Sequence, residues 1–121
     1  MFKHAGEDGY KTVLEKVRIK TLAYGENTLM AEFRLEAGAN LPLHNHPHEQ
    51  TGYLVSGKME LTIGNDTFPV NPGDSWSIAG GVEHQAAASK ESVAIEVFYP
   101  VREDYLPGVK ISGDIDWEQI S

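Results

Sequence analysis

The sequence predicts an all-β fold, built as an antiparallel barrel or sandwich. Many short segments of apolar or β-branched residues are separated by Gly, Pro, Asn and Asp, which favour turns. No segment shows a strong helical period. Short strands with frequent turns and no long helix are typical of two packed antiparallel sheets.

The composition is that of one globular domain spanning residues 1–121. Its hydrophobic fraction is 40% and its charged fraction 23%, which are ordinary values for a soluble domain. A net charge of −8 disfavours nucleic acid or an anionic membrane as a partner, since both need a basic surface. The absence of cysteine excludes disulfides and thiolate metal sites. Residues 1–10 lack the apolar core of a signal peptide, so a cytoplasmic location is expected.

Two strands are expected before a histidine-rich segment. Residues 1–12 are polar and are expected to be irregular. Frequent β-branched residues favour a strand over about 15–24, which ends at a turn in 25–27. In residues 29–35 apolar and polar side chains alternate, the pattern of a half-buried strand.

Six further short strands are expected after the histidine-rich segment. Turn signals divide this part of the chain at residues 56–57, 64–66, 71–74 and 79–81. The predicted strands are 51–55, 59–63, 67–70, 75–78, 82–88 and 92–99. The tail, 101–121, is polar, with packing points expected at Tyr105, Leu106, Ile111, Ile115 and Trp117.

The segment 38–57, GANLPLHNHPHEQTGYLVSG, carries three of the five histidines. His44 and His46 are separated by one residue, so their side chains point to the same side of an extended chain. Gln50 keeps the same parity, and the chain offers a further histidine at His84. We therefore expect these four side chains to bind one divalent metal. Imidazole-rich ligation suits Zn, Ni, Fe, Co or Mn.

Two spaced motifs resemble those of the cupin family. The first runs from Gly38 through five residues to His44-x-His46, then three residues to Gln50 and six to Gly57. The second, fifteen residues later, has Gly73, five residues, Ala79, one residue, Gly81, two residues, His84, three residues and Ala88. The resemblance covers roughly residues 28–99 and implies a double-stranded β-helix, the cupin jelly roll.

The chain departs from the cupin pattern at three positions. The family usually has Glu at the position of Gln50, Pro at that of Ala79 and Asn at that of Ala88. Because an amide oxygen is neutral, three imidazoles and Gln50 leave the full divalent charge uncompensated. Such a site favours an anionic or enolate-forming substrate and acts as a Lewis acid. In the alternative interpretation, Gln50 is a polar strand residue beside a three-histidine site.

A narrower resemblance links residues 96–106, EVFYPVREDYL, to the KdgF-type cupins of pectin and alginate breakdown. Their first motif also commonly reads HPHEQ, as residues 46–50 do here. The resemblance implies a metal-dependent enzyme that converts a 4,5-unsaturated monouronate from its cyclic to its linear keto form. The Asp, Phe and Arg that serve the substrate in those proteins fall on Glu96, Phe98 and Arg102, with Glu in place of Asp.

The residues themselves leave alternatives for each of these three roles. Alternation places Glu96 and Phe98 on one strand face, where Glu96 either meets solvent or enters a polar pocket as a tuned acid or base. Arg102 either holds a substrate carboxylate in bidentate fashion or makes a surface ion pair with Glu103 or Asp104. Phe98 suits a hydrophobic wall better than a specific contact.

The other notable side chains have simpler interpretations. Trp76 and Tyr53 either line the pocket or pack in the core. His48 lies off the motif positions and is expected beside the ligands or on the surface. His4, in the polar N-terminal segment, is expected to be solvated.

Three functions are consistent with these patterns. The leading interpretation is a metal-dependent cupin enzyme acting on a small acidic sugar, as in the KdgF type. The rivals are a dioxygenase that uses Fe, Ni or Cu with molecular oxygen, and a metal-containing sugar-binding module without turnover. Because an exposed sheet edge invites pairing, residues 1–20 are expected to contribute to a homodimer.

Overall fold

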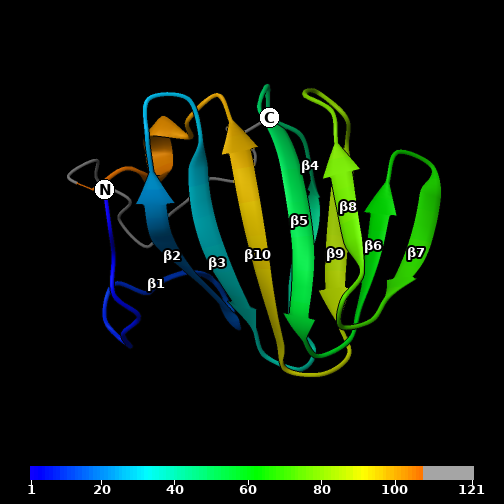
Figure 1. Ribbon diagram of the computed structural model, residues 1–121. Helices are drawn as coiled ribbons and strands as arrows, with labels where there is room; N and C mark the ends of the chain where they lie inside the picture. The colour runs from blue at the N-terminus through cyan, green and yellow to red at the C-terminus, as the bar shows by residue number, and fades with distance from the viewer. Residues whose placement is uncertain (108–121) are drawn as a thin grey trace.

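Ten strands in two antiparallel sheets make up the computed structural model, which describes residues 1–107 (Figure 1). The strands are β1 (Lys11–Leu14), β2 (Val17–Tyr24), β3 (Leu29–Leu35), β4 (Asn40–His44), β5 (Glu49–Ser56), β6 (Met59–Ile63), β7 (Asp66–Val70), β8 (Ser75–Ile78), β9 (His84–Ala88) and β10 (Ser92–Tyr99). The six-stranded sheet has the order β1-β2-β3-β10-β5-β8, and the four-stranded sheet has the order β4-β9-β6-β7. The all-β prediction is confirmed, with a jelly roll whose two sheets are not closed into one barrel by strand pairing.

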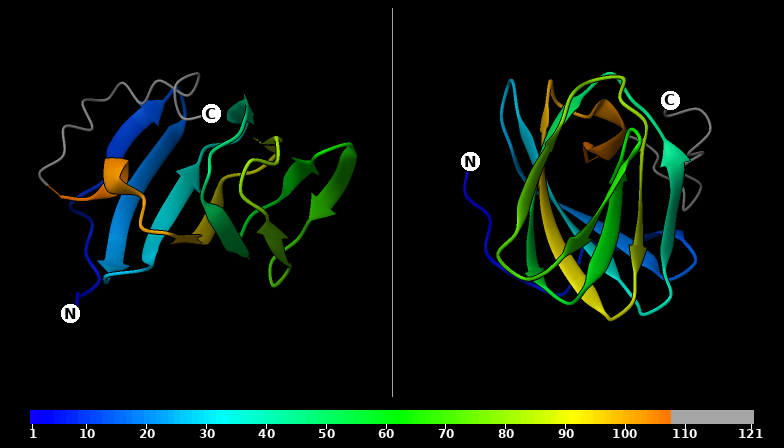
Figure 2. Two further views of the ribbon diagram at one scale, coloured as in Figure 1. Left: turned by 90° about the horizontal axis from the view of Figure 1, so that it is seen from above. Right: turned by 90° about the vertical axis from the view of Figure 1, so that its right-hand side faces the viewer.

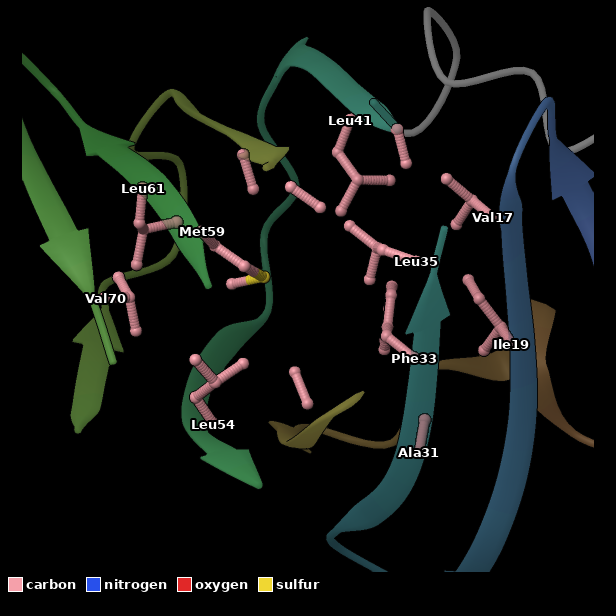
Figure 3. Packing of buried hydrophobic residues seen from close by; sticks show 14 of the residues in the cluster. Val17, Ile19, Ala31, Phe33, Leu35, Leu41, Leu54, Met59, Leu61 and Val70 are labelled. Carbon is pink, nitrogen blue, oxygen red and sulfur yellow. The ribbon is translucent and has the colours of Figure 1, made fainter. Parts of the chain in front are cut away.

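The two sheets face each other and bury their apolar sides between them (Figure 2, right). In β3 every second side chain is buried, as the alternating sequence predicts. The inward side chains of β2 and β3 meet those of the smaller sheet in one core, which includes Val17, Ile19, Phe33, Leu35, Leu41, Met59, Leu61 and Val70 (Figure 3). Burying a side chain of this size contributes about 1.5–3 kcal/mol, so this core holds the sheets together.

The prediction for the N-terminal segment is partly wrong. β2 corresponds to the strand predicted over about 15–24, but residues 1–12 are not all irregular, because β1 begins at Lys11 and forms a hairpin with β2. The chain turns at Glu15 and Lys16, where Lys16 adopts a φ of 66°. A non-glycine residue rarely takes this left-handed conformation, so the sequence carries no usual turn signal there.

Strand register gathers the predicted site residues at one end of the molecule. On the larger sheet Gln50 of β5 lies opposite Phe98 of β10 and Ile78 of β8. On the smaller sheet His44 of β4 lies opposite His84 of β9. This is the end at which β10 stops and the chain continues into η1 (Glu103–Tyr105), a short 3-10 helix drawn in orange in Figure 1.

The described residues contain little helix. Only the three residues of η1 are helical in residues 1–107, and no helix there could cross a membrane. β1 forms one edge of the larger sheet, and an edge strand can pair with a second copy of the chain. The homodimer through residues 1–20 stays a prediction. Of the expected packing points in the tail, Tyr105 is buried and Leu106 packs against the core. Ile111, Ile115 and Trp117 lie outside the described residues.

The turn between β5 and β6 depends on Gly57, which has a φ of +98°. A Cβ there would lie 2.5 Å from Cα of Ser92. We expect Gly57→Ala to lower the free energy of unfolding by about 2 kcal/mol or more, because the new methyl group meets both backbone strain and a clash. Urea denaturation measures this change. Gly25→Ala is the matched control, since no atom lies within 4 Å of its added Cβ. Equal stability of the two variants would contradict the argument.

Candidate metal centre

Three buried histidines come together between the sheets. His44 lies at the end of β4, His46 in the loop before β5, and His84 at the start of β9. Their ring centroids are 4.2 Å (His44–His84), 5.0 Å (His46–His84) and 5.8 Å (His44–His46) apart. One ligand nitrogen from each ring lies within 4.8 Å of the other two. Two imidazoles on one ion, each at about 2.1 Å, span about 4.2 Å at most, so a small closure brings all three onto one metal.

Backbone carbonyls determine which nitrogen each ring can offer. Nδ1 of His44 donates to the Pro42 carbonyl at 2.7 Å, and Nδ1 of His84 donates to the Val82 carbonyl at 2.9 Å. Nδ1 of His46 donates to the backbone of the nearby loop at 3.0 Å. Because a carbonyl can only accept, Nδ1 carries the proton in each ring and Nε2 is left as the metal-binding nitrogen.

Burial keeps these imidazoles neutral. It lowers the pKa of His44 to about 4 and that of His46 to about 3, and it also lowers the pKa of His84. The positive charge of Arg102 adds to this effect at His46. All three rings are therefore unprotonated at neutral pH, which metal binding requires.

The polar atoms around the centre fit a cation. Nε2 of His84 is buried and has no hydrogen-bond partner among residues 1–107. Nε2 of His46 lies 2.8 Å from Oε1 of Gln50, although both atoms are acceptors in the tautomer that the backbone sets. Two acceptors at this distance repel each other unless a cation lies beside both. The three imidazoles could therefore hold a divalent transition metal, with the Gln50 oxygen as a fourth ligand.

A buried carboxyl group lies directly behind Gln50. Glu96 on β10 is 7% exposed; its Oε2 accepts a hydrogen bond from Nε2 of Gln50 at 3.1 Å, and its Oε1 accepts one from Nε1 of Trp76 at 3.1 Å. Burial raises the pKa of Glu96 to about 8, against the opposing effect of these two hydrogen bonds. Glu96 therefore faces the interior, as one of its two interpretations expected.

The close approach of Trp76 and Glu96 requires a glycine between them. Gly52 on β5 lies opposite both residues in the sheet. A Cβ on Gly52 would lie 2.5 Å from Oε2 of Glu96 and would also overlap the Trp76 indole. Gly52 was not among the predicted site residues, although a glycine inside a strand is a known signal of a close approach.

Arg102 is buried at the same cavity and is held by an acid. Its side chain is 1% exposed, and Nε and Nη2 donate to the two carboxylate oxygens of Asp104 at 3.0 and 2.7 Å. The guanidinium carbon lies 5.0 Å from the Phe98 ring centroid and 4.2 Å from that of Tyr105. The ion pair with Asp104 that one interpretation expected is therefore present. Arg102 is nevertheless buried at the cavity that the histidines line, and not on the surface.

One cavity of about 30 Å³ joins all of these groups. It is lined by the three histidines and Gln50, and also by Trp76, Glu96, Phe98, Arg102 and Tyr105. This volume accommodates an ion or a few water molecules. His48, whose carbonyl holds His46, is half-buried beside the centre, whereas Tyr53 and His4 are exposed and lie outside the cavity.

A family model for the cupin domain matches residues 31–98, more than half of the chain. The chain belongs to the cupin family. The two-motif prediction is therefore confirmed at the level of the family. A curated relative, the oxalate decarboxylase OxdC of Bacillus subtilis, is 30% identical over 81 residues, which are 63% of this chain. The cupin spans only 21% of the length of that relative.

Solved structures show the same jelly roll. The structure of KdgF from Halomonas sp. has a TM-score of 0.83 and 27% identity, covering 88% of this cupin and 98% of that chain. An RmlC-like cupin from Shewanella frigidimarina has a TM-score of 0.83 at 22% identity over 87% of this chain and 95% of the other. A salicylate 1,2-dioxygenase from Pseudoaminobacter salicylatoxidans has a TM-score of 0.70 at 14% identity, over 73% of this cupin and 26% of that chain. The second and third comparisons show the fold alone.

We expect a divalent metal to stabilise this cupin through His84. At a free zinc concentration of about one hundred times Kd, binding adds about 2.7 kcal/mol to the free energy of unfolding. Thermal melting with and without zinc measures the effect, and metal analysis after gel filtration gives the stoichiometry. His84→Ala should remove the shift, while His4→Ala, which alters an exposed residue, should keep it. An equal zinc shift in both variants would place the metal elsewhere.

Proposed function

We propose that this cupin is a metal-dependent enzyme that acts on a small acidic sugar. Its reaction is the KdgF-type conversion of a 4,5-unsaturated monouronate from the cyclic to the linear keto form. The observation that carries the proposal is the position of Glu96 and Arg102. Both are buried, and both line the cavity that the three histidines share. The likeness to the Halomonas KdgF structure supports the same assignment.

The charge of the centre suits an anionic substrate. His44, His46 and His84 are neutral and Gln50 is an amide, so a bound divalent ion keeps its full charge. Arg102 adds a positive charge at the same cavity. This local field opposes the net charge of −8 that would otherwise repel an acid sugar.

The proposed reaction moves protons without changing the oxidation state. The hydroxyl at the anomeric carbon loses its proton as the carbonyl forms, and the ring oxygen gains one as its bond to that carbon breaks. The enol so formed then gains a proton on carbon and loses one from oxygen, which gives the ketone. When bound, the metal supplies Lewis acidity that polarises a substrate oxygen.

Glu96 is the group placed to transfer these protons. Each of its carboxyl oxygens already accepts an N–H, from Gln50 or from Trp76. Glu96 also lines the cavity, so a proton on its carboxyl group can pass to a substrate bound there. With a pKa of about 8, the carboxyl group can both give and accept a proton near neutral pH.

Arg102 is the group placed to hold the substrate carboxylate. Asp104 fixes the guanidinium from one side through Nε and Nη2, which leaves Nη1 for a ligand. The cavity of about 30 Å³ is smaller than a sugar ring. Binding of a uronate therefore requires lining side chains to move outward, so that the ring reaches Glu96 and the histidines.

The two rival functions have distinct signatures. A dioxygenase would consume oxygen with an enediol or flavonol-like substrate, and a binding module would hold a sugar without changing it. The dioxygenase neighbour shares the fold at 14% identity, which favours neither function. An oxygen electrode and product analysis by NMR separate the three cases.

We expect the metal-loaded protein to accelerate the loss of the enol-ether absorbance of an unsaturated uronate. Glu96→Gln should lower kcat by about 10²–10⁴-fold, because the proton-transfer group is removed. Glu91→Gln, at an exposed loop position, is the control and should retain activity. Metal content measured on each variant excludes loss of the centre as the cause. No acceleration by the unaltered protein at saturating metal would refute the proposed function.

Arg102→Lys should raise KM for the uronate by about tenfold or more, because lysine keeps the charge but loses the planar fork. kcat should fall as well, because the carboxylate is attached to the carbon that carries the ring oxygen and the double bond, and a shifted carboxylate misplaces both. Steady-state kinetics over a range of substrate concentrations separates the two parameters. Arg18→Lys, on an exposed part of β2, serves as the control. Unchanged KM in Arg102→Lys would remove Arg102 from substrate binding.

A further inference from the structure

A second buried polar group at the cavity, the Tyr105 hydroxyl, has no acceptor for its proton among residues 1–107. Tyr105, in η1, is 2% exposed and lines the cavity, and its hydroxyl makes no hydrogen bond of normal geometry among residues 1–107. Buried hydroxyls are normally hydrogen-bonded, because an unsatisfied one weakens the fold. The uronate mechanism above assigns this hydroxyl no role.

The tyrosine is firmly positioned by other contacts. Its backbone N–H donates to the Arg102 carbonyl at 3.0 Å, and its carbonyl accepts from Oγ1 of Thr21 at 2.6 Å. Its ring packs edge-on against Phe98, with centroids 5.5 Å apart, and against Phe33 at 6.4 Å. Neither the backbone nor the ring needs the hydroxyl for these contacts, so packing alone does not account for a tyrosine here.

The guanidinium of Arg102 stacks against the same ring. Its carbon lies 4.2 Å from the Tyr105 centroid, while Asp104 occupies Nε and Nη2. Burial raises the pKa of the Tyr105 hydroxyl, and an interaction between the hydroxyl and the Arg102 side chain opposes this shift, which places the hydroxyl near the guanidinium. A carboxylate oxygen bound to the guanidinium therefore comes near the hydroxyl. A hydroxyl can donate one hydrogen bond to such an oxygen.

We propose that the Tyr105 hydroxyl donates a hydrogen bond to a carboxylate oxygen of the acidic substrate, beside Nη1 of Arg102. This inference rests on the proposed function and adds a specificity-determining residue to it. Tyr105 and Arg102 then form one carboxylate-binding pair, whereas Glu96 and the histidines serve the neighbouring ring oxygen, anomeric carbon and double bond.

The state of the phenol agrees with a donor role. Burial raises the pKa of Tyr105 to about 12, although the Arg102 charge opposes the shift, so the hydroxyl keeps its proton at neutral pH. The competing explanation is that an ordered water in the cavity takes this hydrogen bond. The two explanations differ in what removal of the hydroxyl does to ligand binding.

Tyr105→Phe separates them, because it keeps the ring and removes only the oxygen. Calorimetric titration of the zinc-loaded protein with D-glucuronate, a stable saturated uronate, should show binding weakened by about 10- to 100-fold. Affinity for D-glucose, which has no carboxylate, should not change, and the melting temperature should not fall. With the unsaturated uronate, kcat/KM should fall by a similar factor. Tyr99→Phe is the matched control, since Tyr99 is 54% exposed on the outer face of β10.

The outcomes distinguish this inference from the proposed function. Equal glucuronate affinity in Tyr105→Phe and the unaltered protein overturns the Tyr105 assignment alone and favours a bound water. A clear fall in melting temperature also overturns it, because the hydroxyl would then have a structural partner. Weakened glucuronate binding without any turnover of the unsaturated uronate overturns the proposed reaction and supports Tyr105. If the unaltered protein binds no glucuronate, kinetics with the unsaturated uronate decide: turnover supports the proposed function, and an unchanged kcat/KM in Tyr105→Phe overturns the Tyr105 assignment.

Discussion

Both carboxyl oxygens of Glu96 are held by N–H donors, and the orientation of the metal centre depends on this. Because Glu96 accepts from the amide nitrogen of Gln50, the amide oxygen of Gln50 is turned toward His46. The Trp76 indole holds the other carboxyl oxygen in place. If the side-chain amide of Gln50 were rotated by 180°, its NH2 group would face the cation and its oxygen would face the carboxyl group of Glu96. The acid and the ligand set are therefore one hydrogen-bonded unit.

Strand periodicity was enough to predict much of this unit. Alternation along β10 placed Glu96 and Phe98 on one face, and parity placed His44, His46 and Gln50 on one side of the chain. The alternation along β10 is a local property of an extended backbone and needs no knowledge of the neighbouring strands. The parity argument gave the right grouping of histidines, but it assumed an extended chain, whereas residues 45–48 form a loop with bends at 47 and 48. The contribution of His84 depended on the spacing of the second cupin motif. The hairpin at residues 11–24 was missed because its turn uses a lysine in a left-handed conformation.

The remaining parts of the site arise only when distant segments meet. Gly52 matters because β8 and β10 bring an indole and a carboxyl group against the same position of β5, a pairing that residue spacing does not specify. In the sequence, Tyr105 is one of several predicted packing residues in a polar tail. Its place at the cavity is set by Thr21, 84 positions away, which binds its carbonyl. Contacts of this range depend on the tertiary fold and have no local sequence pattern.

The pairing of Arg102 with Asp104 explains how a cation can remain buried beside a divalent site. An isolated guanidinium that is 1% exposed would cost several kcal/mol of desolvation, so it needs a permanent partner. Asp104 supplies the charge but uses only Nε and Nη2, and its own side chain remains 38% exposed. The arginine is thus held in one orientation before any ligand arrives. An incoming carboxylate then meets a fixed donor rather than a mobile side chain, and little conformational entropy is lost on binding.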